Sequence, residues 1–327
     1  MKKLLFSLLV MFAVLEWTCS DFPFGLGVDD SPDWVAITAR INSFRQIVLV
    51  DFNNPTKYNF ITNDQYQNFA PNFSPDRKQL VYLARRLGTD HDSGLMLVNI
   101  ASGQIIRILH DKEAGYNMFG NNVVWGPDNT TLYFSQTAFI TTDIVTYNLV
   151  KQSSRFLTAT YEYTEYPVGF KGQDTLIVFS DDTMSTQQPP GYYYMDLNGN
   201  YLGRLNNPHL EFIRRDRYSY LKAAWKPDWN EALGLIVYSQ KDNTAFRGQK
   251  VAVTNLDGSY FKTYTSGEYM DTDPVWGPDG KTVLFWRSDF PTGNSRVLLL
   301  DLESGRISLF VKPEKIGGAT ELSEPDY

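Results

Sequence analysis

The sequence predicts an all-β fold, a six-bladed β-propeller whose blades are four-stranded antiparallel sheets. Three observations lead to this prediction: a hairpin signal that recurs along the chain, a Pro-Asp turn that recurs between the hairpins, and the absence of sustained helical periodicity. One copy of the unit spans about fifty residues and carries four short β-rich runs. Such a repeat is typical of propeller blades, which bury their faces only by packing on neighbouring blades.

The hairpin signal is an Asp or Asn between two apolar residues at the end of a strand. It occurs six times, and the five separations are 48, 49, 48, 59 and 46 residues. Turn dipeptides such as Ser102-Gly103 and Asn198-Gly199 follow it, and they adopt positive φ at little cost. The central residues are Asp51, Asn99, Asn148, Asp196, Asn255 and Asp301.

The Pro-Asp signal marks a second reversal in the unit. Proline presets φ for a turn and cannot donate to a strand ladder, while aspartate can cap the free amides of the turn. One copy, near Phe170-Lys171-Gly172, lacks the Pro-Asp pair. The five copies that we assign to this turn are Ser31-Pro32-Asp33, Ser74-Pro75-Asp76, Gly126-Pro127-Asp128, Lys226-Pro227-Asp228 and Gly277-Pro278-Asp279.

These two signals predict where the blades lie. The first blade opens with a possible innermost strand from Phe22 to Val28, and residues 312–327, with their prolines and acids, are expected to form a flexible tail. Closure of the ring removes exposed strand edges, and either an N-terminal or a C-terminal strand could supply it. The expected propeller spans residues 22–311, with blades at about 22–62, 66–109, 116–158, 163–205, 218–264 and 269–311.

The turn at Trp276-Gly277-Pro278-Asp279-Gly280 and the hairpin at Leu300-Asp301-Leu302 resemble the Pro-Asp type of WD40-like repeat, PD40, found in propellers of the TolB family. That resemblance implies a periplasmic propeller that receives an extended segment of a partner at one mouth of its channel. TolB carries a further α/β domain before its propeller, which we expect this chain to lack. The same repeat also occurs in propellers attached to prolyl oligopeptidase-type hydrolases and in many lipoproteins.

The N-terminus has the pattern of a bacterial export signal. Lys2 and Lys3 precede an apolar run from Leu4 to Leu15, which is too short to span a membrane, and the single cysteine of the chain, Cys19, follows it. We therefore expect a lipoprotein-type signal peptide over residues 1–18 and lipidation of Cys19, although residues 16–18 depart from the usual small residues. A free soluble protein or an uncleaved anchor are the alternatives. The expected location is the periplasm or a membrane of the bacterial cell envelope.

Composition excludes several classes of function. The chain of 327 residues has a formal net charge of −7, so nothing favours nucleic acid as a partner. A single cysteine excludes disulfide bridges and thiolate metal sites. There is no Gly-x-Ser-x-Gly motif, phosphate loop or dinucleotide fingerprint, so we expect no catalytic residue and no cofactor. We expect a monomer.

Aromatic residues recur in the blade-to-blade connections, and the topology of a propeller brings these connections to one mouth of the channel. Tyrosine offers a large contact area with a polar tip, which suits recognition of a peptide or a glycan. Packing between blades is the alternative use of these aromatic residues. The predicted partner-binding residues at the mouth are Tyr66, Tyr116, Asn121, Asn122, Glu165, Tyr166, Tyr220, Tyr269, Asp271 and Asp273.

The sequence therefore predicts a non-enzymatic binding module, exported and lipid-anchored, that recognises a protein or peptide at the channel mouth. The alternative is a propeller enzyme, or a protein that binds or processes glycans, with loop acids and a metal. Its metal-ligand candidates are Asp90, His91 and Asp92, and a solvated loop is the alternative for these residues.

Overall fold

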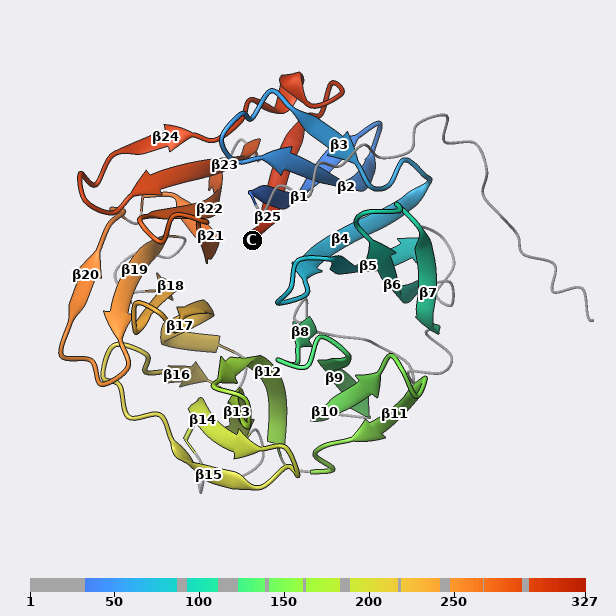
Figure 1. Ribbon diagram of the computed structural model, residues 1–327. Helices are drawn as coiled ribbons and strands as arrows, with labels where there is room; N and C mark the ends of the chain where they lie inside the picture. Colours follow the sequence, from blue (N-terminus) through green and yellow to red (C-terminus); the bar gives the residue numbers. More distant parts are fainter. Residues whose placement is uncertain are drawn as a thin grey trace, which may run out of the picture.

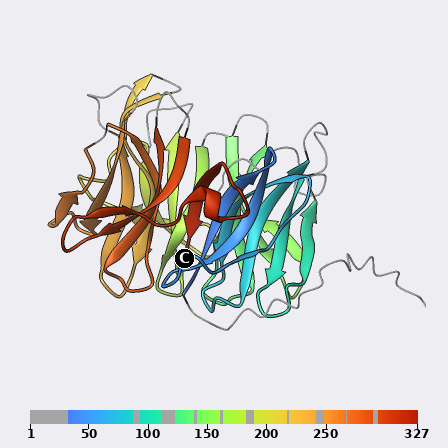
Figure 2. The same cartoon turned by 90° about the horizontal axis from the view of Figure 1, so that it is seen from above.

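The structure is a computed structural model. It describes residues 33–86, 93–110, 123–138, 141–160, 163–182, 189–216, 219–241, 248–266, 268–289 and 294–327. Successive antiparallel sheets follow one another around a common axis and form a ring (Figure 1; Figure 2 shows the ring from the side). The prediction of an all-β propeller is confirmed. In the part of the chain described, no helix has the length and apolar character needed to cross a membrane.

Two sheets have four strands each. The first has the strand order β25 (Glu321–Asp326), β1 (Trp34–Ile41), β2 (Phe44–Asp51) and β3 (Tyr58–Phe60). The second has the order β4 (Tyr66–Phe73), β5 (Gln79–Arg86), β6 (Ser93–Asn99) and β7 (Ile105–His110).

The other two sheets have eight and nine strands, because a single parallel pair, Thr142 with Thr164 or Gln249 with Met270, joins antiparallel groups within each. The eight-stranded sheet contains β8 (Val123–Trp125), β9 (Thr131–Ala138), β10 (Thr141–Asn148), β11 (Ser153–Phe156), β12 (Tyr163–Lys171), β13 (Thr175–Asp182), β14 (Gly191–Asp196) and β15 (Tyr201–Arg204). The nine-stranded sheet contains β16 (Ile213–Asp216), β17 (Ser219–Asn230), β18 (Leu235–Lys241), β19 (Gln249–Asn255), β20 (Phe261–Thr263), β21 (Met270–Trp276), β22 (Thr282–Asp289), β23 (Asn294–Asp301) and β24 (Ile307–Leu309).

The hairpin turns and three of the five assigned Pro-Asp turns form as predicted, because their side chains bind nearby backbone. Ser31 and Pro32 of a fourth assigned turn lie outside the described residues. In the hairpin signal, Asp51 Oδ1 accepts from Asn53 N at 2.9 Å and Asp301 Oδ1 accepts from Ser304 N at 2.7 Å. In the Pro-Asp turn, Asp279 Oδ1 accepts from the amides of Lys281 and Thr282, both at 2.9 Å. Both signals therefore encode their turns within three or four residues.

One assigned Pro-Asp turn is wrong. Lys226-Pro227-Asp228 lies inside β17, where the pairing with β18 shifts between Trp225 and Asp228, and the reversal comes later, with Gly234 N donating to Glu231 O. This proline belongs to a different repeat, in which a residue with positive φ precedes proline in an innermost strand. The four residues of this repeat are Ala70, Lys226, Asp273 and Glu324, with φ of 51°, 49°, 49° and 50°.

The expected flexible tail is also wrong. After a 3₁₀ turn, η1 (Pro313–Lys315), residues Glu321–Asp326 form β25, which pairs antiparallel with β1 as the innermost strand of its sheet. Leu322 is fully buried in a core cluster with Ile37. The chain thus closes the ring with its C-terminal strand. The expected strand Phe22–Val28 lies outside the described residues.

The core lies between neighbouring sheets. Val35 and Ile37 of β1 belong to the same cluster as Leu284 of β22 and Val297 of β23, and similar clusters occur between the other neighbours. The faces of the sheets are buried against each other. The innermost strands therefore line the central axis with their inner edges. The candidate site lies along that axis.

Candidate functional site

Two cavities lie along the axis of the ring. The larger, of about 560 Å³, is called the mouth cavity; the smaller, of about 140 Å³, is called the inner cavity. They share the lining residues Val168, Lys226, Pro227, Asp273 and Glu324, so one continues into the other. The mouth cavity is also lined by Tyr166, Phe179, Tyr192, Trp225, Gln249, Met270, Thr272 and Trp286.

The mouth cavity opens at the predicted end of the propeller. Met270 and Gln249 begin the strands β21 and β19, and Trp286 lies late in β22, so the cavity sits where the blade-to-blade connections and second-to-third strand loops occur. The larger cavity therefore lies at the end of the ring that carries the blade-to-blade connections.

The wall of the mouth cavity is aromatic and held in place by its own contacts. The rings of Tyr166 and Phe179 stack with centroids 6.1 Å apart and planes 24° apart, and Trp225 lies 5.9 Å from Phe179. The Tyr192 hydroxyl donates to the Ala224 carbonyl. Tyr166, Phe179 and Tyr192 lie in β12 to β14 and Trp225 lies in β17. The wall therefore spans the contact between these two neighbouring groups of strands.

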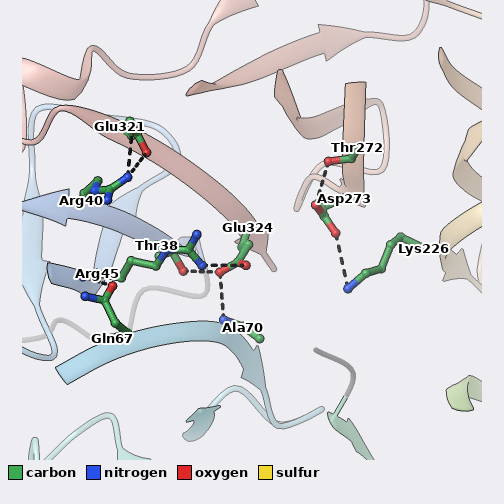
Figure 3. A network of polar contacts seen from close by, with 10 residues as sticks. All are labelled: Thr38, Arg40, Arg45, Gln67, Ala70, Lys226, Thr272, Asp273, Glu321 and Glu324. Carbon is green, nitrogen blue, oxygen red and sulfur yellow. Dashed lines mark hydrogen bonds and ion pairs between the residues drawn. The ribbon is translucent and has the colours of Figure 1, made fainter. Parts of the chain in front are cut away.

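The floor consists of Lys226, Asp273 and Glu324, the three residues of the positive-φ repeat before proline that have charged side chains (Figure 3). Lys226 Nζ lies 3.5 Å from Asp273 Oδ1. Glu324 Oε2 accepts from Ala70 N at 3.0 Å and from Thr38 Oγ1 at 2.8 Å. A left-handed conformation at a non-glycine residue costs about 1 kcal/mol, and such strain concentrates at functional sites.

The inner cavity is lined by two half-buried carboxylates, each of which joins an innermost strand to another one. Asp228 Oδ2 accepts from Trp276 N, and Asp326 Oδ2 accepts from Phe73 N, both at 2.8 Å. Burial raises the pKa of Asp228 to about 6. Burial, with a smaller contribution from the charge of Asp228, raises the pKa of Asp326 to about 7, against the opposing charge of Arg77.

No protein-family model and no curated protein matches the sequence. Among solved structures, the chain is similar to TolB from Acinetobacter baumannii, with a TM-score of 0.67 and 15% sequence identity over 91% of this chain and 67% of that chain. A second TolB-type structure, from Agrobacterium tumefaciens, gives a TM-score of 0.58 and 18% identity over 85% of this chain and 89% of that one.

The chain has a TolB-like propeller fold. Enzymes share this architecture: an oligogalacturonate lyase from Vibrio parahaemolyticus gives a TM-score of 0.53 and 10% identity over 86% of this chain and 74% of that chain. At such identities the likeness concerns the fold, and function has to be argued from the site.

Two of the predicted mouth residues line the mouth cavity of the TolB-like propeller, namely Tyr166 and Asp273. Tyr66 packs against an apolar core cluster. Tyr269 is 37% exposed, and its ring lies 4.4 Å from the Arg287 guanidinium.

Two predicted acids are instead buried partners within the fold. Asp271 is fully buried, and both of its oxygens accept from Arg287, from Nε at 2.6 Å and from Nη2 at 2.7 Å. Glu165 is fully buried and accepts from the Tyr201 hydroxyl, and burial raises the pKa of its carboxyl. Both carboxylates are engaged in the packing of their own sheets.

The remaining candidates lie outside what the structure describes. These are Cys19, Asp90, His91, Asp92, Tyr116, Asn121, Asn122 and the side chain of Tyr220, whose backbone lies in β17. Among the described residues, no group of three or more His, Cys, Asp or Glu could hold a metal ion.

The sequence patterns did not indicate Lys226 and Glu324 on the floor or Trp225, Gln249 and Trp286 on the wall. A signal for the floor exists in the sequence: Lys226-Pro227, Asp273-Pro274 and Glu324-Pro325 each precede an aromatic residue by two or three positions. The wall residues carry no comparable local pattern, because only the packing of neighbouring sheets brings them together.

The two carboxylates of the inner cavity predict a pH-dependent stability of the TolB-like propeller. The folded ring keeps protons on Asp326 and Asp228 at pH values where the unfolded chain, with the usual aspartate pKa of 3.8, has lost them. This contribution favours folding at acidic pH and is lost as the pH rises toward 7. We expect the unfolding free energy of the parent to fall by about 2 kcal/mol more between pH 5 and pH 8 than that of Asp326→Asn.

Chemical denaturation at several pH values measures this difference. Asp301→Asn is the matched control, because hydrogen bonds from Ser304 lower the pKa of this exposed carboxyl and it stays ionised throughout the range. Parallel pH profiles for the parent and Asp326→Asn would contradict the prediction.

Proposed function

We propose that this chain is an exported six-bladed propeller that binds an extended segment of a protein partner in the bacterial cell envelope. The mouth cavity carries the proposal. Its volume of about 560 Å³ lies in the range of ligand sites, and its wall consists of Tyr, Trp and Phe side chains that combine large contact area with few rotatable bonds. The fold shared with TolB supports a binding role in general terms.

The hydrogen bonds and the ion pair made by the floor residues favour a binding role over acid–base catalysis. Asp273 is paired with Lys226 and accepts from Thr272 Oγ1 at 2.8 Å, and Glu324 accepts from Thr38 and Ala70. A carboxylate that already accepts hydrogen bonds from the protein is poorly placed to exchange a proton with a substrate.

Six blades are supported by the antiparallel pairing. The strands group by fours, with β25 completing the first group and β16 extending the fifth. The groups are β25 with β1 to β3, β4 to β7, β8 to β11, β12 to β15, β17 to β20 and β21 to β24. An experimental structure of the ring would count the blades directly.

A peptide-display experiment tests the binding role. Thr272→Trp places a large ring inside the mouth cavity, and Thr263→Trp makes the same change on the exposed outer strand β20. Panning a random peptide library should enrich peptides on the parent and on Thr263→Trp, and Thr272→Trp should bind the enriched peptides at least about tenfold more weakly. Thermal unfolding checks that both variants fold. Equal affinity for Thr272→Trp, or no enriched peptide, would overturn the proposal.

We propose anchoring through a lipid on Cys19, on the basis of the basic residues and the apolar run before it. Radiolabelled fatty acid fed to cells that express the chain should appear in the parent and be lost in Cys19→Ser. An unlabelled parent would remove the anchor from the proposal and leave the binding role untouched.

A further inference from the structure

Two side chains in the wall of the mouth cavity each carry a polar atom that has no hydrogen-bond partner in the described part of the chain. One is Trp286 Nε1, an indole nitrogen that can only donate, and the other is Gln249 Oε1, a carbonyl oxygen that can only accept. Both atoms are buried, and both residues line the mouth cavity. Buried polar groups without a partner are rare, and each asks for an explanation.

Strand pairing places the two residues on either side of the same inner strand. Gln249 of β19 is the parallel partner of Met270, and Trp286 of β22 is the antiparallel partner of Thr272. Met270 and Thr272 are two residues apart on β21, so they share one face of that strand. All four residues line the mouth cavity, so the two side chains that carry the unpaired donor and acceptor flank β21 at the cavity wall.

The charges of the floor favour a neutral ligand group at this place. Lys226 is already paired with Asp273, and Glu324 is held by Thr38, Ala70 and Arg45, whose Nη1 lies 3.9 Å away. An anionic or cationic ligand group would have to compete with these pairs. A neutral group that both accepts and donates would give each of the two unpaired atoms a hydrogen-bond partner and would leave the ion pairs of the floor intact.

The main chain of an extended peptide is such a group. Its carbonyls accept, its amides donate, and the two alternate at intervals of a few ångströms along the segment. We propose that Trp286 and Gln249 recognise the main chain of the bound segment. On binding, each side chain rotates so that its unpaired atom faces the cavity. The Trp286 indole then donates to a peptide carbonyl, the Gln249 carbonyl accepts from a peptide N–H, and an apolar side chain of the segment packs on the aromatic wall. This inference depends on the proposed peptide-binding function.

Small probes test the inference on the full chain. N-acetyl-leucine N-methylamide carries a peptide N–H that N-acetyl-leucine methyl ester lacks, and titration of the ¹⁵N-labelled protein follows the indole N–H signals of the tryptophans. The signal absent from Trp286→Phe is that of Trp286. It should move on addition of the amide probe, whereas the signal of Trp125, whose indole donates to Asn72 O, should not.

Affinities of the variants separate the two contacts. The parent should bind the amide about tenfold more tightly than the ester, as expected for one buried hydrogen bond. Gln249→Leu should abolish this preference, and Gln249→Glu, which keeps an acceptor, should retain it. Trp286→Phe should weaken both probes about tenfold, since both carry carbonyl groups. Thermal unfolding confirms that each variant is folded.

Three outcomes would overturn the inference: equal binding of amide and ester by the parent, binding that leaves the Trp286 signal unmoved, or movement of that signal by N-acetylglucosamine alone. If peptides from the display library still depend on an open mouth cavity in any of these cases, this inference fails and the proposed function stands. If no peptide binds there, the proposed function fails with it.

Discussion

Deletion of residues 321–327 is expected to broaden the thermal unfolding transition of this chain or to lower its midpoint strongly. β25 supplies the innermost strand of the sheet formed with β1, β2 and β3, and its loss would expose the edge of β1 and the core around it. Tyr327, which stacks on the Arg77 guanidinium at 3.8 Å, would be lost as well. Calorimetry should show a transition that is broad or lowered by more than about 10 °C, since a few kcal/mol shift the midpoint of a large domain this far.

A point substitution makes the same test without shortening the chain. Leu322 is fully buried, so Leu322→Ala should lower the unfolding free energy by about 3 kcal/mol. The matched control is Leu309→Ala on the outer strand β24, where the side chain is 40% exposed and the expected loss is below about 1 kcal/mol. Equal effects of the two substitutions, or a deletion that leaves the midpoint in place, would show that β25 does not hold the ring closed.

Removal of the Asp271 carboxylate is expected to cost about 4 kcal/mol, because it leaves the Arg287 guanidinium without its bidentate partner. The control is Glu321→Ala, which breaks the Arg40–Glu321 pair; there the side chains are 47% and 35% exposed, so the expected loss is below about 1 kcal/mol. Urea denaturation of Asp271→Ala and Glu321→Ala measures both.

The double variant Asp271→Ala/Arg287→Ala should be less destabilised than the sum of the two single variants, since it removes the unpaired charge. Additive effects would indicate that the pair does not act as a unit. A loss of partner binding in Asp271→Ala would in any case report on stability, because this side chain does not face the mouth cavity.

The turns were predictable from the sequence because their physical cause is local. Asp279 and Asp301 bind amides within three residues, so the residue pattern contains the whole interaction. Lys226-Pro227-Asp228 was misassigned because a proline suits both a turn and a bulge of an innermost strand, and only the pairing with β18 separates the two.

The floor of the site was predictable only in part. Asp273 was identified from its place after a blade connection, but Glu324 lies in a short, charged segment whose partner Thr38 is 286 positions away in the chain. No window of sequence contains that contact. Asp271 is buried while Asp273 lines the cavity, and this difference likewise depends on the strand register that sets Asp271 opposite Arg287.

Glu324 belongs at once to the strand that closes the ring and to the floor of the mouth cavity. Its carboxylate fastens β25 to β1 through Thr38 and to β4 through the Ala70 amide. Closure and occupancy are therefore thermodynamically linked: a ring open at β25 has no complete floor, and a molecule that requires this floor shifts the equilibrium toward the closed ring. Ligand binding in the mouth cavity and pairing of β25 with β1 therefore report on the same equilibrium. The melting temperature of the propeller should rise with the concentration of a ligand that binds in the mouth cavity.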